Sequence, residues 1–233
     1  MINKASSLQT EDIMECIRRK IVEGDICHRQ KISQNTLARE LNVSRTPIIK
    51  ALHKLETEGL VDYIPNSGFF LHTNSLKEMA ELFEIRQAIE MISAANAAKY
   101  APDEVVQELR QLFIPFEEAG TINSEEYLEA DRSFHNRLLT YCDNQKLLKL
   151  NQTMQIYHQS YLFGLIREPR ATLLEHEEII DAIEARDSNR AKYAMMNHLD
   201  YTGEYLRTAV EKLKGLGFDP NSIPFSSTLQ NKA

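Results

Sequence analysis

The sequence of 233 residues predicts a mainly α-helical fold, with an N-terminal winged helix-turn-helix, a small β-hairpin wing and then an all-α antiparallel bundle of six or seven helices. Three observations support this fold class. Apolar residues recur at helical spacing along most of the chain, a tight turn of about three residues separates two short helices near the N-terminus, and strand signals almost vanish after Ser75.

The first two helices of the winged part follow from apolar spacing and cap residues. Isoleucines at near-helical spacing in the segment 7–23 predict a first helix, which ends at Gly24. A short second helix follows over 32–42, with Ser33 or Asn35 as its N-cap. We therefore expect two helices in front of the tight turn.

The third helix and the wing complete the N-terminal pattern. The segment 43–60 begins with a Ser44 cap, tolerates Pro47 in its first turn and closes at Gly59. The segment 61–73 alternates between apolar and polar residues and breaks at a Pro-Asn-Ser-Gly turn, which is typical of a β-hairpin. Helix, helix-turn-helix and hairpin, in this order, predict a winged helix whose third helix enters the major groove of DNA.

The remainder of the chain reads as helices joined by short loops, which predicts an antiparallel bundle. We place the N-terminal domain at 1–74, the bundle at 75–214 and a loosely ordered tail, rich in Gly, Pro, Ser and Asn, at 215–233. The predicted bundle helices span 75–100, 102–118, 124–141, 144–166, 169–186 and 188–213.

Composition limits the class of protein. Apolar residues make up 42 % and charged residues 26 % of the chain, values that are ordinary for a soluble protein, and no apolar run approaches the roughly 18 residues of a membrane span. The first residues lack the apolar core of a signal peptide. The 3 cysteines form neither a CxxC pair nor a disulfide framework. We therefore expect a cytoplasmic protein without a membrane partner.

The net charge of −7 is unevenly distributed along the chain. Residues 1–74 carry 10 Lys and Arg against 9 Asp and Glu, whereas residues 75–233 carry 17 against 25. The acidic balance therefore belongs to the predicted bundle. A nearly neutral N-terminal part can still present the local basic face that contact with DNA requires.

The text "LARELNVSRTPIIKALHKLETEGLV" over 37–61 resembles the winged-helix domain of GntR-type bacterial transcription regulators, and the resemblance covers residues 7–73. It implies an operator-binding transcription regulator. Ser44 and Thr46 at the start of the third helix can donate to phosphate, and Arg45 can reach a guanine edge or a phosphate. Capping of the helix by Ser44 and Thr46 remains the alternative. The wing tip at Gly68 can approach the minor groove.

The sequence departs from this family at several cationic positions. Such regulators usually read "SRTPVREAL", whereas Ile49 and Lys50 here replace the arginine and the glutamate. Asn35 and Ser67 stand where the family often has arginines. We therefore expect an altered operator, with Lys50 and Ser67 among the contacts, and a shallower dependence of binding on salt.

Four residues of the predicted bundle have side chains that bind metals. Asp131 and His135 lie one turn apart on one helix face, and His176 and His198 lie in two further amphipathic helices. Three imidazoles and a carboxylate can bind one divalent cation, of which Zn, Ni, Co, Mn and Fe(II) all suit this donor set. Spacing alone favours an ordinary structural polar pair over a metal site.

The flanking text "RSFHNRLL", "HEEIIDAIEARD" and "NHL" resembles the FCD effector domain of the FadR subfamily of these regulators over residues 76–210. The resemblance implies that all four residues bind a metal, with Zn or Ni favoured over Mn, Co and Fe. It also implies a homodimer on a pseudo-palindromic operator and a small organic-acid effector. Arg86 matches a family arginine that faces the cavity, and its alternative is a pair with Glu90.

Two other functions fit a metal site of this kind. The metal could serve only to hold the bundle together, or it could activate water in a metal-dependent hydrolase or lyase. A hydrolase or lyase would need a general base, and no convincing candidate is present, because Glu177 and Glu178 adjoin His176 without forming an HExxH motif. A winged helix also has no role in such an enzyme, so we expect no catalytic activity.

Overall fold

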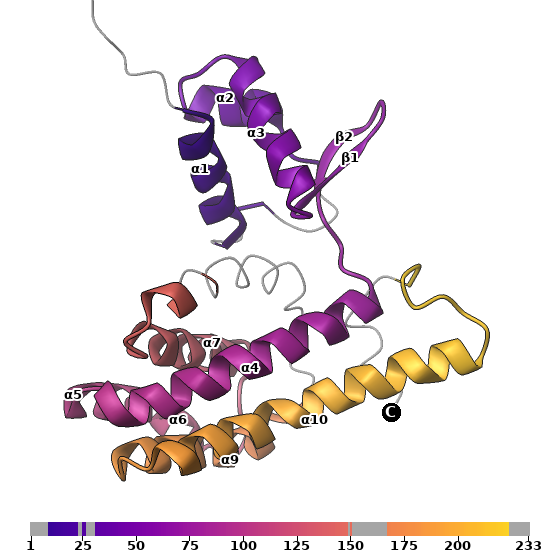
Figure 1. The fold of residues 1–233 in the computed structure, drawn as a ribbon. Helices are drawn as coiled ribbons and strands as arrows, with labels where there is room; N and C mark the ends of the chain where they lie inside the picture. The colour runs from indigo at the N-terminus through magenta and orange to yellow at the C-terminus, as the bar shows by residue number, and fades with distance from the viewer. Residues whose placement is uncertain (1–8, 23–24, 27–30, 149, 151–166, 224–233) are drawn as a thin grey trace, which may run out of the picture. The chain divides into compact units, whose positions relative to one another are not determined.

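A computed structural model describes residues 9–22, 25–26, 31–148, 150 and 167–223. The described residues fall into two compact units, which divide between Thr73 and Asn74 (Figure 1). Each unit has its own apolar core. The described residues are 71 % helical and contain a single two-stranded sheet, so the mainly α-helical prediction is confirmed.

The first unit contains the three predicted helices. Helix α1 spans Thr10–Val22, α2 spans Gln34–Glu40 and α3 spans Arg45–Thr57. Ser33, rather than Asn35, caps α2, because its hydroxyl accepts a hydrogen bond from the Thr36 amide at 3.2 Å. The turn between α2 and α3 contains Asn42 in the left-handed region, with φ of 51°, which an asparagine tolerates. The helix-turn-helix prediction is therefore correct.

The wing is an antiparallel hairpin. Strand β1 spans Val61–Ile64 and β2 spans Gly68–Leu71, with Val61 opposite Leu71 and Ile64 opposite Gly68. The inward residues Val61, Phe69 and Leu71 join the core that α1 and α3 form with their isoleucines and leucines. The unit is thus built as the alternating pattern predicts, with one hairpin face covering the helices.

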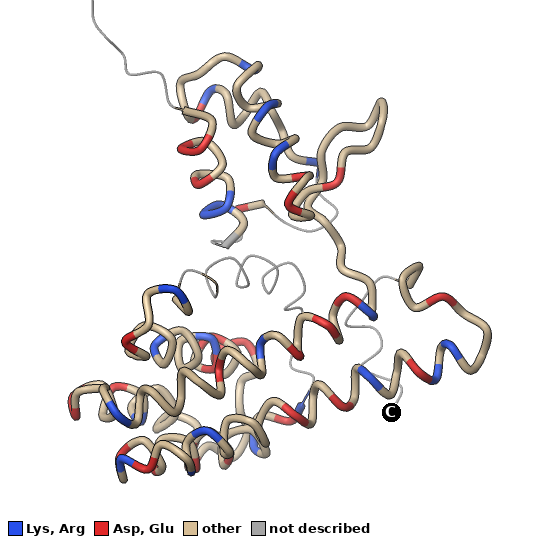
Figure 2. The backbone as a smooth tube through the Cα atoms, viewed as in Figure 1, with Lys and Arg blue, Asp and Glu red and all other residues tan. Residues whose placement is uncertain are grey.

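The second unit is a bundle in which six helices fall within the described residues. The two long helices α4 and α10 pack along each other, and α7 and α9 pack against α4 (Figure 1). Acidic and basic residues are interspersed along α4 and α10 (Figure 2). The helices are α4 (Leu76–Tyr100), α5 (Asp103–Gln111), α6 (Ile114–Glu117), α7 (Ser124–Thr140), α9 (Pro169–Glu184) and α10 (Ser188–Gly215).

Caps and breaks define the ends of these helices. Ser75 and Glu78 form a reciprocal capping box at the start of α4. The predicted helix over 102–118 is instead two helices, because Pro115 has no amide hydrogen to donate to the Gln111 carbonyl four residues earlier, where α5 ends. The predicted helix over 144–166 lies largely outside the described residues, although 145–148 are helical.

The first residues of the predicted loose tail are in fact held in place. Gly217, with φ of 79°, turns the chain after α10, and the Leu76 amide donates to the Ile223 carbonyl at 3.0 Å. The tail therefore returns to the start of α4, as far as it is described. None of the described helices is long and apolar enough to cross a membrane.

Candidate metal centre and nucleic-acid interface

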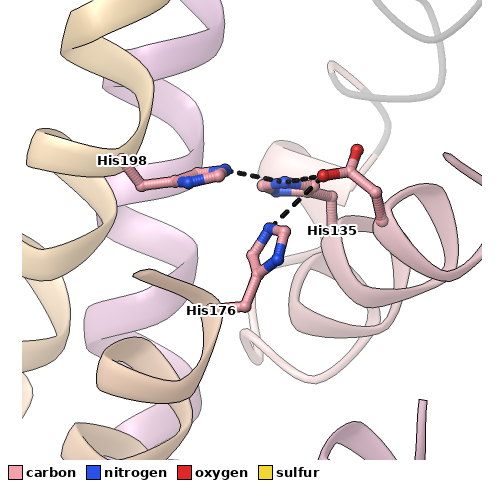
Figure 3. Close-up of side chains that lie close together, drawn as sticks. His135, His176 and His198 are labelled. Atoms are coloured by element: carbon pink, nitrogen blue, oxygen red, sulfur yellow. Dashed lines mark hydrogen bonds and ion pairs between the residues drawn. The ribbon is translucent and has the colours of Figure 1, made fainter. Parts of the chain in front are cut away.

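Three helices bring the four predicted ligands together. Helix α7 carries Asp131 and His135, α9 carries His176 and α10 carries His198. One candidate ligand atom from each residue lies within 4.8 Å of the others. The imidazoles are buried, and that of His176 is 0 % exposed. Figure 3 shows the three rings turned toward one point.

The ring nitrogens that face this point are the Nε2 atoms. Nε2 of His176 lies 3.3 Å from Oδ1 of Asp131, and Nε2 of His135 lies 3.8 Å from the same oxygen. Nε2 of His198 lies 3.3 Å from Nε2 of His135 (Figure 3). A shared set of three Nε2 atoms and one carboxylate oxygen is the donor arrangement of a single-cation site.

Two of the outward Nδ1 atoms face carboxylates. Nδ1 of His135 lies 2.5 Å from Oε2 of Glu90 on α4, and Nε of Arg86 donates to the other oxygen of Glu90 at 2.7 Å. Nδ1 of His198 lies 2.9 Å from Oε2 of Glu175. Glu175 is therefore placed to accept from Nδ1 of His198, and the close contact with Glu90 favours a proton on Nδ1 of His135, so that both Nε2 atoms face inward.

The third imidazole is held by a neutral chain instead. Nδ1 of His176 lies 3.1 Å from the Tyr127 hydroxyl, which lies 2.9 Å from the hydroxyl of Thr172. The Thr172 hydroxyl in turn donates to the Pro169 carbonyl at 3.1 Å. Because the Pro169 carbonyl can only accept, the series of hydrogen bonds can run from His176 Nδ1–H to Tyr127, from Tyr127 to Thr172 and from Thr172 to Pro169. With the proton of His176 on Nδ1, its Nε2 lone pair is free for a cation.

The charges and the burial of the cluster shift the pKa values of its three histidines in different directions. Burial lowers the pKa of His135, but the charges of Glu90 and Asp131 outweigh it and raise the pKa to about 9. Burial and the neighbouring His198 lower the pKa of His176 to about 3, and burial also lowers the pKa of His198. Burial opposes ionisation of Asp131, yet the adjacent His135 and His176 hold its pKa well below the ordinary value.

These residues fit a divalent cation. The Nε2 of His176 is buried, and within the described residues no group completes a hydrogen bond with it. An unsatisfied buried nitrogen costs free energy unless another partner, such as a metal ion, occupies the position beside it. Three neutral imidazoles and an ionised carboxylate suit Zn²⁺ and Ni²⁺ as well as Mn²⁺, Co²⁺ and Fe²⁺.

The other polar residues singled out in the bundle lie elsewhere. Arg86 forms an ion pair with Glu90, which was the alternative to its predicted role in binding the effector. Its side chain is only 12 % exposed. Glu178 is exposed and binds Arg190 at 2.8 Å, so it faces away from the cluster. The outer partners Glu90 and Glu175 were missed, because only the packing of α4, α7, α9 and α10 shows which acids reach a histidine.

The predicted DNA contacts gather at the start of α3 and at the wing. Ser44, Thr46 and Lys50 are exposed, and Ser44 occupies the N-cap position without a side-chain capping bond. Arg45 is also exposed, and its Nε and Nη2 donate to Oε1 of Gln34 at 2.8 and 2.6 Å. The exposed hydroxyls and the guanidinium therefore lie on one side of the helix start.

The wing places its two predicted residues beside this helix start. Ser67 is exposed at the turn, and Gly68 has φ of 111°, a value that L side chains rarely adopt. Arg45, Ser67, Gly68 and Asn35 all line the same surface hollow. Gln34, which holds Arg45, was missed because its role depends on the turn that brings α2 against α3.

Comparison with known proteins decides the family. The model of the FCD domain matches residues 81–201, about half of the chain, and the model described as bacterial regulatory proteins, gntR family, matches residues 9–71. The chain belongs to the gntR family. It is a gntR-family transcription regulator with an FCD domain, as the sequence predicted.

Relatives of this gntR-family chain have regulatory names. It is 28 % identical to the Nta operon transcriptional regulator of Aminobacter aminovorans, over 79 % of this chain and 90 % of that protein. It is also 28 % identical to the HTH-type transcriptional repressor RspR of Escherichia coli K12, over 84 % and 88 %.

Solved structures share the fold of this gntR-family regulator. Escherichia coli McbR/YncC superposes with a TM-score of 0.63 at 16 % identity, over 86 % of this chain and 97 % of that one. A GntR protein of Rhodococcus sp. RHA1 superposes with a TM-score of 0.64 at 19 % identity, over 86 % and 98 %. At such identities the likeness concerns the fold alone.

Proposed function

We propose that the chain binds a pseudo-palindromic operator as a homodimer and responds to a small organic acid that binds, together with a divalent metal ion, in the FCD domain. The observation that carries the proposal is the set of three inward Nε2 atoms around Asp131, each with its Nδ1 held from outside. Such outer partners are characteristic of metal-binding histidines.

The proposed operator contacts begin at α3. The hydroxyls of Ser44 and Thr46 and the adjacent helix amides are suited to phosphate, and Lys50 adds a charge one turn further along. Gln34 orients the guanidinium of Arg45 without neutralising it, because an amide carries no charge. A symmetric pair of such heads calls for two operator half-sites related by two-fold symmetry.

The proposed metal is held by Asp131, His135, His176 and His198, and Zn or Ni is the favoured identity. When bound, it supplies a fixed positive charge and Lewis acidity to a buried site. Four protein donors complete a tetrahedral zinc site, whereas a six-coordinate metal would leave positions for an effector carboxylate. An organic acid is therefore the effector class that this centre favours.

Arg86 is proposed to take part in binding the effector. Its Nε already donates to Glu90, but a guanidinium has five N–H donors in a planar fork and can hold two carboxylates. Arg86 would thus connect the effector to the carboxylate that holds His135. Replacing Arg86 with lysine keeps the charge, removes the fork and should weaken effector binding more than metal binding.

The test measures metal, effector and DNA on one preparation of the full chain. Elemental analysis identifies the metal that copurifies, and a chelator then removes it. If the metal acts in effector binding, the stripped protein loses effector affinity while its helical circular dichroism persists. Melting without lost effector affinity would instead favour the alternative, in which the metal only stabilises the bundle.

Coupling between the two domains gives a second, independent test. If the effector changes operator affinity by some factor, the operator must change effector affinity by the same factor, because binding free energies are linked. Titrating the effector with and without operator DNA measures one factor, and titrating the operator with and without effector measures the other. Equal effector affinity in the two titrations would refute regulation by this route.

A further inference from the structure

An isolated antiparallel bridge, which the sequence does not indicate, joins the segment 31–32 to the edge of the wing. The Ile32 amide donates to the Phe69 carbonyl at 2.8 Å, and Lys31 forms an antiparallel bridge with Phe70. Ile32 is buried in the core of the first unit, whereas Lys31 is exposed. The alternation of a strand therefore directs Lys31 outward at the edge of the hairpin.

The side chain of Lys31 extends along this edge to the wing turn. Its Cε lies 2.9 Å from the position that a Cβ would take at Gly68, so any larger residue there would displace the lysine. Gly68 also has a positive φ, which L side chains rarely adopt, so a substitution there would be strained. The glycine thus allows the ammonium group of Lys31 to reach the tip of the wing, next to Ser67.

Lys31 and Arg45 line one surface hollow of about 480 Å³ between the start of α2, the start of α3 and the wing. Its remaining polar lining is uncharged and includes Gln34, Asn35, Asn66 and Ser67. No carboxylate lines it, and within the described residues Lys31 belongs to no ion pair. A hollow with two cations, amides and hydroxyls and no acid is suited to a phosphodiester group.

We propose that Lys31 is the cationic DNA contact of the wing and binds a backbone phosphate beside the one nearest Arg45. This inference rests on the proposed operator binding. It restores, from a neighbouring segment, the positive charge that Ser67 lacks at the wing turn. The number of cationic contacts is therefore larger than the residues of α3 and the wing turn alone indicate.

The experiment measures how operator affinity depends on salt, using the full chain and a duplex of about 30 base pairs selected by it from a random-sequence pool. Fluorescence anisotropy is recorded from 50 to 200 mM salt for the unaltered chain and for Lys31→Gln. Each homodimer loses two phosphate contacts, one per protomer, which lowers the magnitude of the slope of log affinity against log salt by about 1.8, so that the fall in affinity over this range is roughly twelvefold smaller. Lys31→Arg should keep the original slope.

Lys54→Gln is the matched control, because Lys54 lies in the same unit but binds Glu11 at 2.9 Å. It should leave the slope unchanged. An unchanged slope for Lys31→Gln, with normal helical circular dichroism, would overturn the role of Lys31 while leaving operator binding intact. If the unaltered chain itself selects no duplex, the proposed operator binding fails instead.

Discussion

The hydroxyl of Tyr127 is expected to control the affinity of the metal centre, although it does not face the common point of the ligands. It bridges Nδ1 of His176 and the hydroxyl of Thr172, at 3.1 and 2.9 Å. Tyr127→Phe removes only this oxygen and keeps the ring, which packs edge-on against Phe116 with centroids 5.2 Å apart. The substitution therefore isolates one hydrogen-bonding group without opening a cavity.

The magnitude follows from what the substitution leaves behind. Nδ1 of the fully buried His176 loses its partner, which costs about 1–3 kcal/mol of unfolding free energy in the metal-free protein. The imidazole also loses the acceptor that favours a proton on Nδ1, so metal affinity should fall by about 10–100-fold. Thr172 is affected less, because it still donates to the Pro169 carbonyl.

The assay is a competition titration of Zn²⁺ between the metal-free protein and a chromophoric chelator, accompanied by urea unfolding. Tyr193→Phe is the matched control, because it removes the same hydroxyl from a side chain that is 54 % exposed on α10. It should change neither quantity. If Tyr127→Phe binds Zn²⁺ within twofold of the unaltered chain, the proposed role of the Tyr127 hydroxyl is wrong.

Three further predictions concern the ligands and the DNA-contact face. His135→Ala should lower metal affinity more than Tyr127→Phe does, because it removes a metal ligand. Amide hydrogen exchange in α1–α3 should stay unchanged, and altered exchange in these helices would contradict the separation of the two units. Metal affinity should rise about tenfold per pH unit between pH 7 and about 9, because the pKa of His135 is about 9 in the metal-free protein and metal binding must displace the extra proton of this imidazole. Calorimetry in buffers of different ionisation enthalpy measures the number of protons released on metal binding. A value of zero would exclude the displacement. Gln34→Ala should weaken operator binding by about 0.5–1.5 kcal/mol, because Arg45 loses its orienting acceptor, and anisotropy with the selected duplex tests this against Gln111→Ala in α5.

The helices were predicted well where apolar spacing and caps agree. Ser75 and Ser33 begin helices as expected, and the turn at Asn42 separates α2 from α3. The break at Pro115 was missed because the apolar pattern continues across it, whereas the backbone cannot. The bridge between Lys31 and Phe70 was missed because two residues are too few to show an alternating pattern.

The metal ligands were recognisable because their spacing matched a family pattern, but the rest of the site was not. Asp131 and His135 share a helix face by periodicity alone, while their meeting with His176 and His198 depends on how α7, α9 and α10 pack. Glu90 lies 45 residues before His135 in the sequence, yet its carboxylate lies 2.5 Å from that imidazole. No local pattern could connect them.

By itself, the sequence determined the order of helices and hairpin, the family and the four candidate ligands. These properties depend on periodicity and on short motifs, which are local. Only the tertiary structure decided which nitrogen of each histidine faces inward, that Arg86 pairs with Glu90, and that Lys31 lies across Gly68. The reason is physical: hydrogen bonds and ion pairs between distant residues require side chains to meet within about 3 Å, and only the packing of whole helices and strands brings them that close.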